Sequence, residues 1–178
     1  IIELMVVVGI IIILTTLALV SYRAGQQQLL LQRAAHKLAQ DLRRAQEMAM
    51  SAKDFEGTPS NGGYGIYFNK NEPNHYFLFA DCNENRDYDA SGIAGSCVEA
   101  IGVNTYPEEF ETIEIEKGVK ISSFSPISPS DDLTITFTPP NPDIFFNPPN
   151  AASSTITLTT DGKTKSIIIN KAGLIEIE

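Results

Sequence analysis

Residues 4–20 read LMVVVGIIIILTTLALV, an uncharged and mostly apolar run near the start of a chain of 178 residues. This run lies at the short edge of what crosses a bilayer, where about 20 apolar residues are typical. A secretory signal peptide would instead begin with positive charge and end at a small-residue cleavage site. Here Glu3 precedes the run and no Ala-x-Ala sequence follows it. The sequence therefore predicts a retained, membrane-inserted helix.

The helical pattern continues past this run and becomes amphipathic after Leu29. Apolar residues recur there at three- and four-residue spacings, which places them on one stripe of a helix: Leu31, Ala34, Ala35, Leu38, Leu42, Ala45 and Ala49. No proline occurs before Pro59, so we expect one helix of roughly 50 residues, about 75 Å long, with Gly25 as the point of bending. The predicted parts are a transmembrane or filament-core half (residues 1–25), an amphipathic half (26–53) and a globular head (54–178).

The head is predicted to be rich in antiparallel strands. After Lys53 the chain consists of short alternating runs, and Asp161-Gly162 between two of them is a hairpin signal. The expected strands are Tyr64–Phe68, His75–Ala80, Thr112–Lys117, Leu133–Thr138, Thr155–Thr160, Lys165–Asn170 and Leu174–Ile177. The overall fold class is thus α+β, with a long N-terminal helix packed on an antiparallel β-rich head.

A proline-rich segment interrupts this pattern. Residues 126–149 hold seven of the ten prolines, so the segment is expected to be a loop or an interrupted edge strand. Phe145 and Phe146 lie within it. At least one of them is expected to pack inward, and the alternative is an exposed contact with another subunit.

Charge is unevenly distributed along the chain. Residues 1–53 carry six Lys or Arg and three Asp or Glu, a net of +3, whereas residues 54–178 carry seven against nineteen, a net of −12. An acidic head argues against broad attraction to nucleic acid or anionic lipid. The basic helix residues Arg33, Lys37, Arg43 and Arg44 are expected to pair with acidic heads of neighbouring subunits, and DNA binding is the less favoured alternative.

Two cysteines, Cys82 and Cys97, lie close together in a polar stretch. If the head is outside the cytoplasm, a disulfide is expected between them, and two free thiols are the alternative. Within the same stretch, DCNENRDYD has the spacing of a calcium loop. Its candidate ligands are Asp81, Asn83, Asn85, Asp87 and Asp89. The alternative is an acidic surface turn stapled by the disulfide, because Arg86 replaces the turn glycine and Gly92 the bidentate glutamate.

Glu3 is the unusual residue at the start of the apolar run. In a membrane interior an unpaired acid costs about 2.5–3.5 kcal/mol, and the next nineteen residues contain no cation. One interpretation places Glu3 among lipid headgroups at the helix N-terminus, where the helix dipole favours a negative charge. The other pairs it with a group on a neighbouring subunit, such as an N-terminal amine.

The run IIELMVVVGIIIILTTLALVSY closely resembles the N-terminal signal-anchor of type IV pilins and type II secretion pseudopilins. Mature chains of that family begin with Phe and have Glu at the fifth position. Glu3 matches this Glu, so two residues are expected to precede Ile1, while Val20 stands where many pilins have Pro. The resemblance implies that Glu3 neutralises a neighbour's terminal amine and that the apolar helix forms the filament core through Leu4, Val8, Ile11, Leu14 and Leu17.

A weaker resemblance, to H-type minor pseudopilins and minor pilins, covers LAQDLRRAQEMAMSAK and the final GLIEIE. The resemblance to this family implies a subunit that polymerises from the membrane into a type IV pilus-like filament. A minor pseudopilin of a type II secretion system is the alternative. The resemblance also implies prepilin peptidase, N-methylation, assembly machinery and related pilins as partners. The location implied is the inner membrane of a bacterium before assembly, then a periplasmic or cell-surface filament.

No catalytic motif accompanies these features. The two histidines, His36 and His75, stand in no recognisable nucleophile context, and the sequence contains no phosphate-binding glycine loop or zinc motif. We therefore expect no enzyme activity and no required cofactor, with Ca²⁺ as the one candidate ion. A rival of another class is a monomeric membrane-tethered domain that binds a ligand with its proline-rich and acidic loops.

Overall fold

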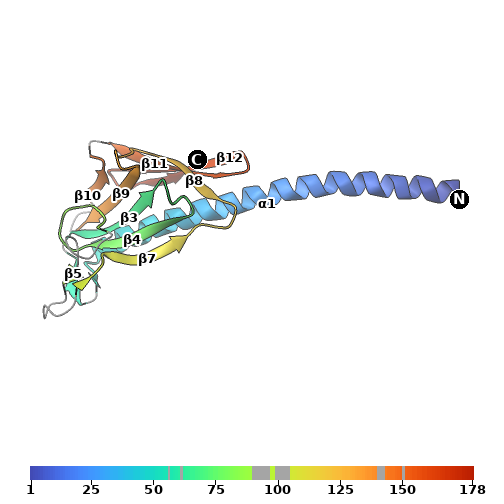
Figure 1. Ribbon diagram of the computed structural model, residues 1–178. Helices are drawn as coiled ribbons and strands as arrows, with labels where there is room; N and C mark the ends of the chain where they lie inside the picture. Colours follow the sequence, from blue (N-terminus) through green and yellow to red (C-terminus); the bar gives the residue numbers. More distant parts are fainter. Residues whose placement is uncertain (56, 61, 90–96, 99–104, 140–142, 150) are drawn as a thin grey trace.

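The computed structural model describes residues 1–178 except 56, 61, 90–96, 99–104, 140–142 and 150. Its longest element is the helix α1 (Ile2–Met50). The first half of α1 extends away from the head and ends at the N-terminus, whereas its second half lies against the strands (Figure 1). The helix runs through Gly25 without interruption.

The second half of α1 is held by the apolar stripe that the sequence predicts. All seven predicted stripe residues, from Leu31 to Ala49, are at most 5% exposed, and Leu42 and Ala45 are completely buried. Alanines alternate with leucines along this stripe, so the backbone of the helix can approach the strands closely. The stripe contacts β3, β9, β11, β12 and β13, which makes α1 part of the hydrophobic core of the head.

The head contains two main antiparallel sheets. The five-stranded sheet has the order β10-β9-β3-β4-β7, and the four-stranded sheet has the order β13-β12-β11-β8. Two short pairs, β1-β2 and β5-β6, accompany them. The strands are β1 (Asp54–Phe55), β2 (Thr58–Pro59), β3 (Gly63–Asn69), β4 (His75–Asp81), β5 (Cys97–Val98), β6 (Thr105–Tyr106), β7 (Glu109–Glu114), β8 (Lys120–Ser125), β9 (Asp132–Thr138), β10 (Asp143–Asn147), β11 (Ser153–Thr160), β12 (Lys163–Asn170) and β13 (Ile175–Ile177).

The predicted fold class is wrong in making the helix a long apolar membrane span. No helix in the described part of the chain is long and apolar enough to cross a membrane. From Leu31 onward the helix is amphipathic and belongs to the head, and strands form most of the regular structure of the head. The predicted membrane and transmembrane-helix character is wrong for the same reason.

Most predicted strands are confirmed, with shifts at their ends. The hairpin turn is also confirmed, because Thr160 pairs with Lys163 and both Asp161 and Gly162 have positive φ, as a tight two-residue turn requires. The largest shift is in β7, which ends at Glu114 instead of Lys117 because the chain turns before Gly118. The prediction missed β8 entirely. The proline-rich segment contains an edge strand, β10, at the end of the five-stranded sheet.

Candidate functional site

The apolar first half of α1 presents its side chains to solvent. The five residues predicted for a filament core are Leu4, Val8, Ile11, Leu14 and Leu17, and they are 47–71% exposed. Exposure is not confined to one stripe, because Val6, Val7, Ile10, Ile12 and Ile13 between them are 50–62% exposed as well. An apolar helix exposed on every side is expected to be covered by several neighbours rather than by one.

Glu3 lies in the first turn of this exposed helix. Among the described residues the structure gives its carboxylate no hydrogen bond and no ion pair. The group that would neutralise Glu3 in the resemblance, a neighbour's terminal amine, belongs to another molecule. The role of Glu3 in assembly therefore stays a prediction.

The basic residues of the helix divide into two kinds. Arg44 forms an ion pair with Glu111 of β7 at 2.7 Å, and the Lys37 ammonium donates to the carbonyl of Glu114 at 3.0 Å. These two cations hold the helix to its own head. Arg33 and Arg43 are exposed, so the predicted pairing between subunits can involve these two residues.

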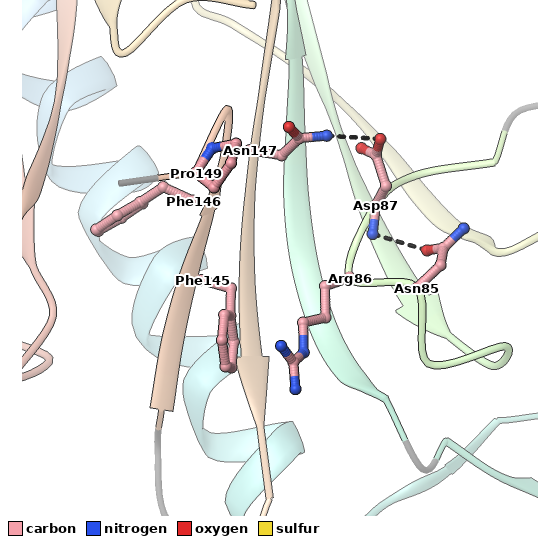
Figure 2. A pocket seen from close by; sticks show the side chains of 7 residues that line it. All are labelled: Asn85, Arg86, Asp87, Phe145, Phe146, Asn147 and Pro149. Atoms are coloured by element: carbon pink, nitrogen blue, oxygen red, sulfur yellow. Dashed lines mark hydrogen bonds between the residues drawn. The ribbon is translucent and has the colours of Figure 1, made fainter. Parts of the chain in front are cut away.

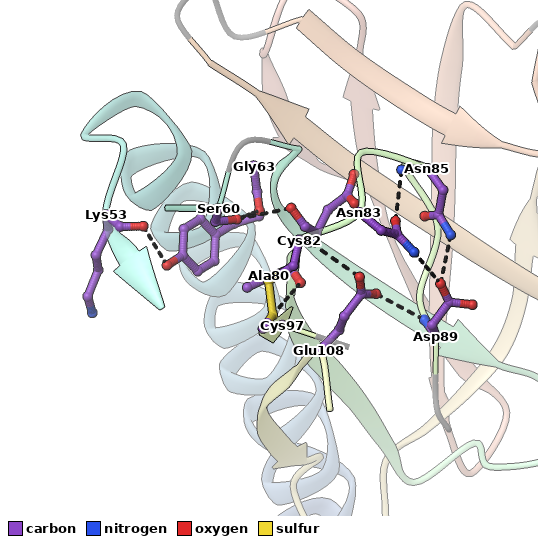
Figure 3. Close-up of a disulfide and its surroundings, with 12 residues drawn as sticks. Lys53, Ser60, Gly63, Ala80, Cys82, Asn83, Asn85, Asp89, Cys97 and Glu108 are labelled. Carbon is purple, nitrogen blue, oxygen red and sulfur yellow. Dashed lines mark hydrogen bonds between the residues drawn. A yellow bond between two sulfur atoms is a disulfide. The ribbon is translucent and has the colours of Figure 1, made fainter. Parts of the chain in front are cut away.

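The acidic loop begins where β4 ends, at Asp81. A disulfide joins Cys82 to Cys97 of β5, with a Cα–Cα distance of 5.2 Å (Figure 3). Its sequence separation is 15 residues, and closing a loop of that length stabilises a fold by about 3 kcal/mol in the chain-entropy model. The disulfide therefore fixes one end of the acidic loop against the head.

The predicted calcium ligands are only partly brought together. The side-chain amides of Asn83 and Asn85 both donate to Oδ2 of Asp89, at 2.9 and 2.7 Å (Figure 3). Asp87 points elsewhere and accepts hydrogen bonds from Thr134 Oγ1 and Asn147 Nδ2, at 2.6 and 2.7 Å. N–H groups thus occupy the centre where a cation requires oxygen atoms. Within the described ranges no group of three or more His, Cys, Asp or Glu side chains could hold a metal. Calcium binding by this loop therefore stays a prediction.

Two buried carboxylates anchor the acidic loop instead. Glu108 is completely buried, and its two oxygens accept the backbone N–H groups of Cys82 and Asp89, at 3.2 and 3.1 Å (Figure 3). Asp81 is also completely buried, and its Oδ2 accepts the N–H of Arg86 at 2.9 Å, while Oδ1 has no hydrogen-bond partner among the described residues. Both ends of the loop are therefore tied to carboxylates in the interior of the head.

Burial controls the protonation of these two acids. Burial raises the pKa of Glu108 to about 7; the N–H groups of Asp89 and Cys82 lower it, and the negative charges of Asp81 and Asp89 raise it. Burial likewise raises the pKa of Asp81, against the opposing effect of hydrogen bonds from the backbone of residues 84–86. Of the two acids that hold the loop, Glu108 therefore changes charge near neutral pH.

An aromatic side chain completes the attachment of the loop. Tyr88 packs among Tyr67, Phe77 and Phe79, with its ring stacked on Phe77 at a centroid distance of 5.5 Å. Its hydroxyl donates to Glu109 at 3.2 Å. The loop consequently covers the side of the five-stranded sheet that carries Tyr67 and Phe77.

The proline-rich segment contributes two phenylalanines with different environments. Phe146 is 5% exposed and belongs to the core, as expected for at least one of the pair. Phe145, which precedes Phe146 in β10, is half-buried. The guanidinium of Arg86 lies 3.7 Å from the centroid of the Phe145 ring (Figure 2). Arg86 and Phe145 line a cavity of about 380 Å³ together with Asn85, Asn147 and Pro149.

Sequence reasoning missed the residues that organise this part of the head. Glu108 was not singled out, because an acid between Glu109 and a proline carries no sign of burial. In the sequence, Arg86 stood out only as a departure from the calcium-loop pattern. A bulky residue at a position that favours glycine also indicates a strained backbone conformation. His75 contacts Glu72 and Phe77, and the absence of enzyme activity stays a prediction.

No family model matches the chain, and no curated protein or solved structure is similar to it. The resemblance to type IV pilins and pseudopilins thus rests on the N-terminal residues, above all on Glu3 and the apolar run that follows it.

Proposed function

We propose that this chain is a structural subunit that assembles with copies of itself into a filament of the type IV pilin kind. One observation carries the proposal: the first half of α1 exposes apolar side chains on all sides, whereas its second half is buried in the head. Among the residues that the structure describes, the head provides no partner for the exposed half. Copies of the same helix are the simplest partners of matching length and chemistry.

The free energy available from this contact is large. Burying a Val, Leu or Ile side chain is worth about 1.5–3 kcal/mol, and the exposed half carries more than ten such residues, each at least 47% exposed. Association and ordering oppose this gain. Bundling of several helices also explains why apolar side chains are exposed on all sides of the described residues 4–17, since each helix in a filament core has neighbours on every side.

A matched pair of substitutions tests the proposal. Electron microscopy of material sheared from cells producing the full precursor should show thin filaments that contain this chain. Ile11→Asp should abolish them, because a charge would be buried in the core without a partner. Gln40→Asp, at an exposed position on the part of α1 that belongs to the head, should leave them intact. Abundant filaments from the Ile11→Asp variant would contradict the proposal.

The axial register of such a filament is expected to depend on Glu3. Glu3→Ala should abolish filaments or make their subunit spacing irregular, because a neighbour's terminal amine would lose its counter-charge in an apolar environment. Glu47→Ala removes an exposed acid from the same helix and should have no effect. The readout is the sharpness of the layer lines in filament images, and unchanged layer lines in Glu3→Ala would contradict the pairing.

A further inference from the structure

Arg86 adopts a backbone conformation that its residue type disfavours. Its φ is +64°, in the left-handed region where Gly is unstrained and a residue with a Cβ is not. In calcium loops with the spacing of DCNENRDYD, the corresponding position is a glycine. Strained residues of this kind persist where the surrounding structure holds them, and they concentrate at functional sites. The strained backbone therefore indicates that Arg86 is a candidate functional residue.

The surroundings hold Arg86 in this conformation from both sides. Its N–H donates to Asp81 at 2.9 Å, and its carbonyl accepts the hydroxyl of Thr136 at 3.1 Å. With the backbone fixed, the guanidinium carbon lies over the ring of Phe145 on the edge strand β10, 3.7 Å from the ring centroid (Figure 2). Stacking occupies the face of the guanidinium and leaves its N–H edge available for a planar, two-point contact.

The acid next to Arg86 in the sequence does not use this edge. The two oxygens of Asp87 accept hydrogen bonds from Thr134 and Asn147, and the N–H of Tyr88 also donates to Asp87. Figure 2 shows the Asp87 carboxylate directed toward Asn147 and away from the guanidinium. In the described part of the chain, Arg86 belongs to no ion pair. A head with a net charge of −12 thus presents one stacked, exposed arginine beside a cavity.

The cavity next to the guanidinium offers an organic anion one cation and an apolar wall. Its volume is about 380 Å³. Phe145, Phe146 and Pro149 supply apolar surface, and the polar lining is Asn85, Asn147 and Asp87, whose two oxygens already accept hydrogen bonds from Thr134 and Asn147. A carboxylate matches the two-point geometry of a guanidinium. A phosphate dianion matches it too, but would meet stronger repulsion from the acidic head.

We propose that Arg86 and Phe145 form a binding site for an acidic peptide segment. A Glu or Asp carboxylate of that segment pairs with the N–H edge of Arg86, and its carbon chain lies on Phe145 and Pro149. A peptide is favoured over other carboxylates because Phe145 belongs to β10, which ends the five-stranded sheet and can receive an extended segment by strand addition. This site is separate from the helix surface through which we propose that the filament assembles.

The binding test uses the full chain in detergent micelles and isothermal titration calorimetry. The probe is a blocked peptide of Thr residues with a single central Glu, and its matched control has Gln in place of that Glu. The wild-type chain should bind the Glu peptide at least about tenfold more tightly than the Gln peptide. Equal affinities would overturn the proposal. Binding of glutarate, a carboxylate without a peptide backbone, more tightly than the Glu peptide would overturn the assignment to a peptide.

Arg86→Gly separates loss of the ligand from loss of the fold. Glycine removes the guanidinium and relieves the strained φ, so binding of the Glu peptide should fall at least about tenfold while Tm stays the same or rises. Arg33→Ala, which removes an exposed arginine from α1, should change neither. A fall in Tm of the Arg86→Gly variant without any loss of peptide affinity would show that Arg86 only holds the loop in place, and would overturn the proposal.

Discussion

Leu42→Ala is expected to lower the free energy of unfolding of the head by about 3–5 kcal/mol. Leu42 is completely buried on α1, where the helix packs against strands of both main sheets. Truncation removes the transfer free energy of the lost methyl groups and leaves a cavity, because the close packing on both sides prevents the sheets from collapsing into it. The measurement is urea denaturation followed by tyrosine fluorescence, since the chain has no Trp.

Leu29→Ala is the matched control for this substitution. It makes the same chemical change on the same helix, but Leu29 is 47% exposed and precedes the buried stripe. The free energy of unfolding should therefore change by less than about 0.5 kcal/mol. Similar losses in the two variants would mean that the second half of α1 is not an integral part of the core of the head.

The sequence predicted the elements whose pattern is local. The spacing of Leu31, Leu38 and Leu42 indicates a buried helical stripe wherever the helix packs, and Asp161-Gly162 specifies a tight turn whatever its neighbours are. Alternation in β11 likewise indicates a strand with one buried face, whereas β9 alternates in sequence but is buried on both faces. These features depend on residues within one or two turns or pleats of each other, so a single sequence is sufficient to reveal them.

The residues of the apolar run do not by themselves determine whether it lies in a membrane. Hydropathy indicated that residues 4–20 avoid water, but it did not indicate which apolar environment covers them. No helix in the described part of the chain is long and apolar enough to cross a membrane, and apolar exposure on all sides suits a bundle of identical helices. The sequence pattern alone could not distinguish lipid from protein as the partner.

The acidic loop shows why the site could not be predicted in the same way. The spacing of Asp81, Asn83 and Asn85 is that of a calcium loop, yet the loop is held by Glu108, which comes from a distant part of the sequence and satisfies two of its N–H groups. The position of Asp87 depends on Thr134 and Asn147 in two other strands. Contacts of this kind arise from the sheet topology and have no local signature.

The Glu108 carboxylate is expected to make the head less stable as pH rises through neutrality. Burial raises its pKa from 4.5 to about 7 in the folded chain, so between these values the folded state holds a proton that the unfolded state has released. Raising the pH therefore favours unfolding across this interval, and the effect is complete above pH 7. The loss attributable to Glu108 is on the order of 3 kcal/mol. Asp81 acts in the same direction, because burial raises its pKa as well.

Glu108→Gln isolates this contribution. The amide keeps one oxygen to accept an N–H and cannot ionise, so the variant should be less stable than wild type at pH 4.5 but should lose less stability on going to pH 8. The measurement is the free energy of unfolding of both proteins, obtained by urea denaturation from pH 4.5 to 8. The stability advantage of wild type at pH 4.5 should fall by about 3 kcal/mol by pH 8, to a smaller advantage or to a disadvantage. Glu116→Gln, at an exposed position, should follow the wild-type curve. If the difference between wild type and Glu108→Gln is constant across this range, Glu108 does not titrate between the two pKa values, and the loop is held by a carboxylate that is ionised throughout.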